Sequence, residues 1–298
     1  MEVRKPTWTT ASFLLYTGGL TVLVAAIGSL AYLSVYYGKG ALVAWALLPL
    51  VVLIAVAFAL RRRGRWIAAG VFAFSWVAVW AGFLGILFTW WGWNIDAGNS
   101  AFAGWHWVLW VLLLLVVAAA AALLRVFRFP FLFPYVLVGL WFIVTDVVSG
   151  GGTWTAVVTL VIGILYLLVG VVVDRGSGRA YGFWWHLVGG LLIGGSLLFW
   201  WHSTEADWSL VATASVLYIL VGGATWRSSW AVLGVGGAFA AAIHWTIEWV
   251  NVGFSIFAPN RTWVPFVVFA VVGFFLVVLG LYVDWRRRRG EVVVPVAQ

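Results

Sequence analysis

Residues 102–124, FAGWHWVLWVLLLLVVAAAAALL, determine the fold class, because this run of 23 residues contains one titratable side chain, that of His106. A helix needs roughly 20 apolar residues to cross a hydrocarbon core about 30 Å thick. Nine other stretches share this length and composition. The predicted spans are residues 12–36, 40–60, 66–88, 102–124, 131–149, 153–173, 182–202, 207–225, 229–250 and 263–283. They predict an all-α protein, a polytopic membrane bundle of about ten transmembrane helices.

Basic residues divide unevenly between the two sides that these spans define. If the N-terminus is cytoplasmic, fifteen of the seventeen lysines and arginines lie inside, and only Lys39 and Arg261 lie outside. An excess of lysine and arginine in cytoplasmic connectors sets the orientation of membrane proteins. Both termini are therefore predicted to be cytoplasmic, with the protein in the plasma (inner) membrane. The inner basic residues are Arg4, Lys5, Arg61, Arg62, Arg63, Arg65, Arg125, Arg128, Arg175, Arg179, Arg227, Arg286, Arg287, Arg288 and Arg289.

Composition narrows the classes of partner and cofactor. The net charge of +8 does not indicate nucleic-acid binding in a chain that is 65% hydrophobic, and at the cytoplasmic face it favours anionic lipid headgroups. Without cysteine the chain has no disulfides and no cysteine-ligated metal centre. We expect a single transmembrane domain over residues 1–289 and a short cytoplasmic tail over 290–298. Most of the 24 tryptophans are expected to form belts at the membrane interfaces rather than to contact a ligand.

Titratable side chains inside spans mark candidate sites, because they are costly in hydrocarbon. Apart from the arginines at inner ends, these side chains are expected to gather toward the outer side. The sharpest pattern is His244, Glu248 and Asn251, whose spacing places them on one stripe of a helix. Such a pair could share a proton, hold a cation or bind a polar ligand group; alternatively, it satisfies itself and caps the helix end. The other candidates for a ligand-binding site on this side are Asp146, His202 and His106.

No recognisable catalytic motif accompanies these groups. A membrane-embedded metal-dependent hydrolase would use the outer His/Asp/Glu cluster, but neither HxxxH nor HExxH occurs. Phosphate-binding GxxxxGK[ST] and nucleophile GxSxG patterns do not occur either. We therefore expect no cofactor and no metal. The favoured function is non-enzymatic: binding of a lipid or small amphipathic solute, or a role as subunit of a larger membrane assembly with protein partners. Secondary transport and hydrolysis remain the alternatives.

Glycine and proline positions suggest how the spans are organised. Gly18-Gly19 and Gly189-Gly190 are 171 residues apart, and the inner junctions at Trp66 and Trp230 are 164 apart. Spans 1–4 and 7–10 could thus be parallel repeats; alternatively, all inner junctions need the same arginine, tryptophan and glycine. Gly190 and Gly194 form a small-xxx-small pair that should pack helices within the chain. Prolines at 130 and 134 predict a rigid corner between the fourth and fifth spans.

Several of these junctions carry a resemblance to a known family. The run from Leu14-Leu-Tyr-Thr-Gly-Gly19 to Tyr36, and Arg61-Arg-Arg-Gly-Arg-Trp-Ile-Ala-Ala-Gly70, resemble bacterial multi-pass membrane proteins classed only as a domain of unknown function. Those proteins look like successive apolar hairpins joined by arginine-rich, glycine-containing inner turns. The segments 226–234 and 281–289 are similar in style. The resemblance implies a prokaryotic inner-membrane protein and assigns no site residues.

Overall fold

The computed structural model describes residues 36–93, 107–149, 151–176, 179–225 and 227–251, with a few isolated positions before and after them. All regular structure in these ranges is helical. The elements are α2 (Lys39–Arg62), α3 (Trp66–Trp90), α4 (Trp107–Phe127), the short 3-10 helix η1 (Pro130–Leu132), α5 (Phe133–Val148), α6 (Gly152–Asp174), α7 (Arg179–Trp200), α8 (Glu205–Thr225) and α9 (Ser228–Asn251).

The described ranges contain eight helices long and apolar enough to cross a membrane, with η1 and α5 counted as one. These eight coincide closely with the second to ninth predicted spans, so the all-helical, membrane-spanning class is confirmed. The first and tenth predicted spans and the tail over 290–298 lie outside the described residues. The parallel repeat, which includes both of those spans, therefore stays a prediction.

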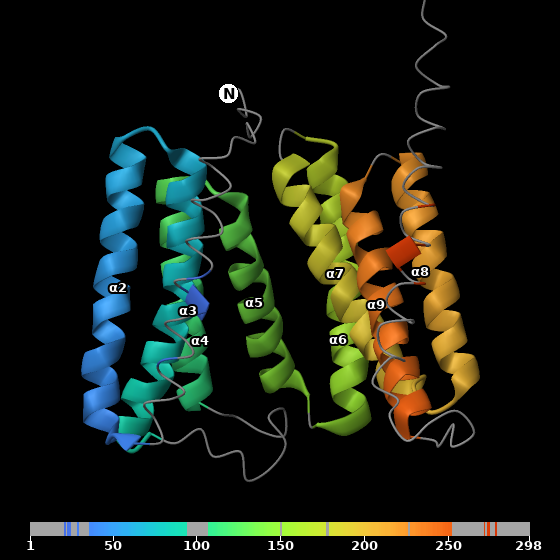
Figure 1. Ribbon diagram of the computed structural model, residues 1–298, viewed down its shortest axis with the longest axis horizontal. Helices are drawn as coiled ribbons and strands as arrows, with labels where there is room; N and C mark the ends of the chain where they lie inside the picture. Colours follow the sequence, from blue (N-terminus) through green and yellow to red (C-terminus); the bar gives the residue numbers. More distant parts are fainter. Residues whose placement is uncertain are drawn as a thin grey trace, which may run out of the picture. The chain divides into compact units, whose positions relative to one another are not determined.

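The chain forms two compact units, Met1–Thr159 and Leu160–Gln298, whose boundary falls within α6. In the first unit α2 packs along α3, and α4 contacts both α3 and α5 (Figure 1). Most of its buried side chains are apolar, as Leu53 and Val77 are, but so are many exposed ones, such as Val51. Because lipid tails are as apolar as the core, close fit between helices matters more here than hydrophobicity. Gly139, for example, lies directly against Val117 of α4.

The corner between α4 and α5 has the proline geometry that the sequence indicates. Arg128 adopts a positive φ of 51°, Phe129 is extended, and Pro130 begins η1. Pro134 then lies in the first turn of α5. Proline is accepted at these positions because the first helical turn has N–H groups without an intrahelical acceptor. Leu132, fully buried, anchors the turn in the first unit's core.

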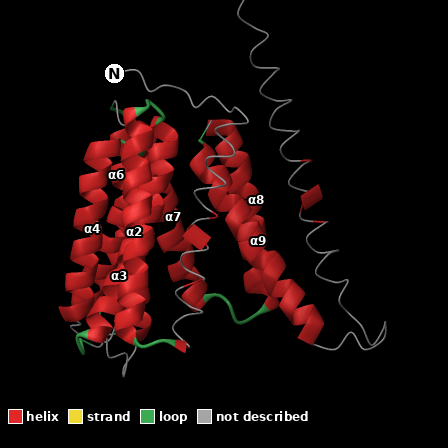
Figure 2. Ribbon diagram, turned by 60° about the vertical axis from the view of Figure 1, so that its left-hand side comes forward, coloured by secondary structure: helices red, strands yellow, loops and turns green. Residues whose placement is uncertain are grey.

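In the second unit α8 packs along α9, and α7 contacts α9. Helices make up nearly all of the described chain, as Figure 2 shows. Glycines allow close approaches: a Cβ at Gly189 would lie 2.9 Å from the carbonyl oxygen of Gly163 on α6, and a Cβ at Gly222 would lie 2.7 Å from the amide nitrogen of Ala231. The backbones of neighbouring helices therefore touch, and this contact fixes where their side chains meet.

Candidate functional site

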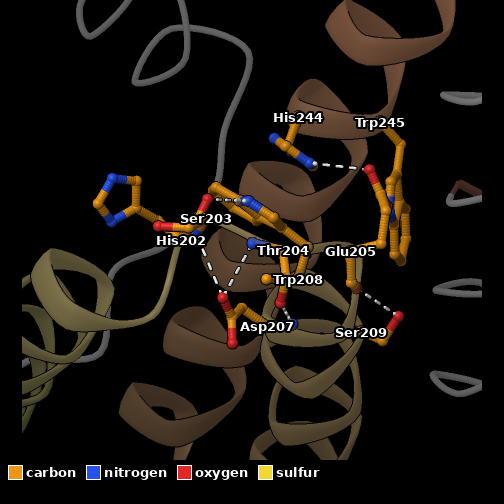
Figure 3. Close-up of polar contacts among 9 residues, drawn as sticks. All are labelled: His202, Ser203, Thr204, Glu205, Asp207, Trp208, Ser209, His244 and Trp245. Atoms are coloured by element: carbon orange, nitrogen blue, oxygen red, sulfur yellow. Dashed lines mark hydrogen bonds and ion pairs between the residues drawn. The ribbon is translucent and has the colours of Figure 1, made fainter.

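The turn between α7 and α8 is held by a reciprocal pair of hydrogen bonds (Figure 3). The Asp207 amide donates to Oγ1 of Thr204 at 3.2 Å, and Oδ2 of Asp207 accepts from the amides of Thr204 and Ser203 at 3.0 and 3.1 Å. This exchange is a capping box, which satisfies amides at a helix start that have no intrahelical acceptor. It fixes the first turn of α8 and with it the position of Glu205.

Glu205 links the start of α8 to α9. Its Oε2 accepts a hydrogen bond from the indole Nε1 of Trp245 at 2.9 Å, and its Oε1 lies 3.5 Å from Nε2 of His244. The Glu205 side chain is nevertheless 59% exposed. One hydrogen bond thus orients the carboxylate, while most of the side chain stays accessible.

His244 is held by stacking rather than by hydrogen bonds. Its ring lies 4.2 Å from the ring of Trp208, with only 8° between the planes. The Trp208 indole donates to the backbone oxygen of His202 at 3.1 Å. Among the described residues Nε2 of His244 is buried without a hydrogen-bond partner, because the Glu205 contact has only ion-pair distance. The result is a layer of two indoles, an imidazole and a carboxylate at one end of the second unit (Figure 3).

The charge at this end is negative. Glu205, Asp207 and Glu248 all lie there, whereas the lysines and arginines in the described part of the second unit lie at the opposite ends of its helices. Asp207 is engaged in the capping box, so Glu205 and Glu248 supply the available charge. A concentration of one sign of charge raises the local concentration of the opposite ion.

The predicted site residues fall in different places. His202 and His244 belong to this cluster, although His202 offers it a backbone oxygen and turns its Nδ1 to the Leu198 carbonyl at 2.8 Å. Glu248 lies one turn beyond His244, half-buried, without a hydrogen bond or ion pair to any described residue. His106 and the side chain of Asn251 lie outside the described residues.

Asp146 belongs to the first unit, where it is fully buried and its Oδ2 accepts from the indole of Trp110 at 2.5 Å. The expected convergence of Asp146 with His244 therefore involves both units and stays a prediction. No group of three or more His, Cys, Asp or Glu side chains that could hold a metal occurs in the part of the chain that the structure describes.

The sequence reasoning missed a second polar cluster at the opposite end of the second unit. It consists of Asp174, His186 and Arg227, which come from α6, α7 and the residue before α9. The expectation that titratable groups gather toward the outer side was therefore wrong for these residues. One signal was present: His186 lies inside an apolar span, where a lone imidazole is costly.

No protein-family model, curated protein or solved structure matches this chain. The resemblance to bacterial multi-pass membrane proteins therefore stays a prediction. What guides a functional proposal is the chemistry of the two polar clusters in the second unit.

Proposed function

We propose that this integral membrane protein binds an amphipathic molecule with an amine-bearing headgroup at the outer ends of α8 and α9. The observation that carries the proposal is the Glu205 carboxylate, oriented by Trp245 yet 59% exposed. An ammonium group can pair with the open carboxylate lone pairs and also contact an indole face, an attraction of about 0.5–2 kcal/mol. The local excess of carboxylates also favours a positively charged headgroup.

An apolar tail also has a surface to follow from this headgroup position. Ile243 and Ile247 lie one turn apart on α9 with exposed side chains, and Leu210 is 65% exposed one turn into α8. Ile247 lies beyond Trp245 toward the end of α9, whereas Ile243 and Leu210 lie nearer to the apolar middle of their helices than the contact between Trp245 and Glu205. A molecule with one charged end and one hydrocarbon end therefore fits the site better than a fully polar solute.

Binding can be tested with three probes of equal chain length: a long-chain alkylammonium, the matching alcohol and the matching carboxylate. The full chain in lipid nanodiscs should bind the ammonium best, and Glu205→Gln should weaken that binding about tenfold, or about 1.4 kcal/mol. Glu248→Gln is the comparison: it removes a carboxylate from the same end without touching Trp245 or Trp208, so it should weaken binding less than Glu205→Gln does. Equal binding of alcohol and ammonium, or no effect of Glu205→Gln, would refute the proposal.

We also propose a lipid contact in the first unit, at the arginine-rich end where α2 ends and α3 begins. The Arg61 guanidinium lies 5.3 Å from the ring of Trp66 and 5.6 Å from that of Phe127, and no described carboxylate pairs with it. A guanidinium held in place without a counter-charge suits an anionic headgroup. Arg61→Gln should reduce retention of phosphatidylglycerol in native mass spectra, whereas Lys39→Gln at the other end of α2 should not. Equal retention in both variants would remove this site.

The arginine distribution also supports a location for the amine site. We place the outer ends of α8 and α9 on the external face of a bacterial inner membrane, with both termini cytoplasmic. In this orientation the Glu205 cluster receives molecules from outside the cell or from the outer leaflet.

A further inference from the structure

In the second polar cluster, three charged or titratable side chains contact one another. Nε2 of His186 lies 2.6 Å from Oδ2 of Asp174, and Nη1 of Arg227 contacts the same oxygen. Nη1 also lies 2.8 Å from Nε2. The side chains of His186 and Asp174 are only 3% and 11% exposed, whereas that of Arg227 is 39% exposed. Nε2 of His186 and Nη1 of Arg227 thus both contact the same carboxylate oxygen of Asp174.

No single protonation state satisfies all three contacts. If Nε2 carries a proton it donates to Asp174, but then it cannot accept from Arg227, which always donates. If Nε2 is bare it accepts from Arg227, but then it faces the carboxylate oxygen with lone pair against lone pair. The contact between bare Nε2 and Asp174 becomes favourable only if Asp174 carries the proton. The arrangements differ by the place of one proton, and each gives Arg227 a different set of acceptors.

The other imidazole nitrogen, Nδ1, lacks a partner as well. It is buried without a hydrogen bond to any described residue. It faces the backbone of α6 at Gly170, where an added Cβ would lie 3.2 Å from it. A second glycine, Gly182 of α7, leaves room for the Asp174 carboxylate, whose Oδ1 an added Cβ would strike. Both glycines therefore shape the space in which these two side chains sit.

The groups that face His186 in the described chain are few. Asp174 comes from α6 and Arg227 from the start of α9, while Trp230 of α9 lies 6.0 Å away and is itself stacked on Tyr218 of α8. Arg175 is the next residue after Asp174 but is exposed and has no ion pair among the described residues. The charged groups that contact His186 among the described residues are therefore one carboxylate and one guanidinium.

We propose that Asp174, His186 and Arg227 form a proton-binding site at the arginine-bearing end of the second unit. The proton is taken up at the His186 imidazole, where it strengthens the contact with Asp174 and turns the contact with Arg227 into repulsion between two donors. Arg227, the most exposed member, then moves away from the imidazole. Release of the proton removes the positive charge of the imidazolium, and Arg227 can then return beside it. The site thus links the protonation of α7 to the start of α9, independently of the amine site at the other end.

The chain has only four histidines, so the protonation of the His186 ring can be followed by NMR once the other three are replaced. The full chain with His106, His202 and His244 each changed to glutamine keeps the cluster intact and leaves His186 as the only histidine. With ¹⁵N-labelled histidine, in lipid nanodiscs, the two ring nitrogens should change shift together between about pH 5 and pH 8. A ring that stays in one protonation state over this range while the protein stays folded would overturn the proposal.

Two substitutions then distinguish a proton-binding site from a set of contacts that only stabilises the fold. Asp174→Asn removes the carboxylate beside the imidazole and Arg227→Gln removes the guanidinium, so each should change the midpoint pH of the His186 signal change. Arg175→Gln is the control and should leave the midpoint in place. Contacts that only stabilise the fold would make both variants less stable without changing this midpoint, and that result would refute the proposal.

Discussion

At the scale of single residues, sequence spacing identifies neighbours on one helix but not partners on another. His244 and Glu248 are four apart on α9, yet the contacts of His244 are with Trp208 and Glu205 of α8. The stacking explains this choice, because the flat contact with Trp208 fixes the ring and directs Nε2 toward α8. The spacing predicted a polar site at this end of α9, whereas the identity of the carboxylate depends on how the two helices pack.

Replacing Trp208 tests how far the site depends on this stack. Trp208→Ala removes the face on which His244 lies and the donor to the His202 oxygen. Aromatic pairs contribute about 0.5–1.5 kcal/mol beyond their buried area, so unfolding in a denaturing detergent should become easier by at least that amount. Trp201→Ala provides the control, because Trp201 is 56% exposed and its indole has no ring or hydrogen-bond contact to described residues. Equal losses in both variants would mean that the stack contributes nothing specific.

The capping box makes a separate prediction at the start of α8. Thr204→Ala should cost about 1 kcal/mol of stability, because an amide at the helix start loses its side-chain acceptor, and Thr204→Ser should cost much less. Chemical unfolding of the two variants measures the difference. Asp207→Ala combined with Thr204→Ala should cost less than the sum of the single changes, since the residues exchange hydrogen bonds. Strict additivity would contradict the reciprocal arrangement.

The cluster of Asp174, His186 and Arg227 shows the limit of residue-level prediction. Asp174 and Arg227 are 53 positions apart, and Asp174 and His186 are 12 apart on different helices. No periodicity relates such positions. The sequence revealed that an imidazole lies in an apolar span, but only the crossing of α6, α7 and α9 shows that a carboxylate and a guanidinium meet it there.

At the scale of elements, the helices were predictable and their contact faces were not. Apolar runs between arginine-bearing and tryptophan-bearing junctions located eight described spans closely. The pair Gly190 and Gly194 was expected to pack as a unit, but Gly190 meets Leu233 while a Cβ at Gly194 would meet nothing within 4 Å. The close backbone approach of α7 to α6 uses Gly189 and Gly163 instead. A run rich in small residues offers several faces, and the neighbouring helix determines which one is used.

This difference gives a matched pair of substitutions on α7. Gly189→Ala places a methyl group 2.9 Å from the Gly163 oxygen, which belongs to backbone and cannot turn away. It should force α6 and α7 apart and lower stability by about 1–3 kcal/mol. Gly194→Ala enters open space and should be neutral or stabilising by up to about 1 kcal/mol, since alanine favours helix. Thermal unfolding of the two variants in the same nanodiscs measures both effects, and a larger loss for Gly194→Ala would contradict the α6–α7 packing.

At the scale of the whole molecule, orientation rests on charge and on the even alternation of spans. The connectors after α2, α4, α6 and α8 carry arginine, whereas those after α3, α5 and α7 carry none. If each of these helices crosses the membrane once, successive connectors lie on alternate sides, so these two sets of connectors lie on opposite sides. The positive-inside tendency then predicts that the arginine-bearing side faces the cytoplasm. The first and last predicted spans do not enter this argument, because each connector is flanked by described helices.

The chain contains no cysteine, so a single introduced thiol reports its own side of the membrane without any background. Ser203→Cys, in the connector after α7, should react with an impermeant maleimide in intact cells. Ser177→Cys, in the arginine-bearing connector after α6, should react only once the membrane is permeabilised. The same side assignment places Glu205 outside and Arg227 inside, so this experiment also tests where the amine site and the proton site open. Labelling of both thiols in intact cells would mean that α7 does not cross the membrane, and labelling of Ser177→Cys alone would reverse the orientation and exchange the two sites between faces.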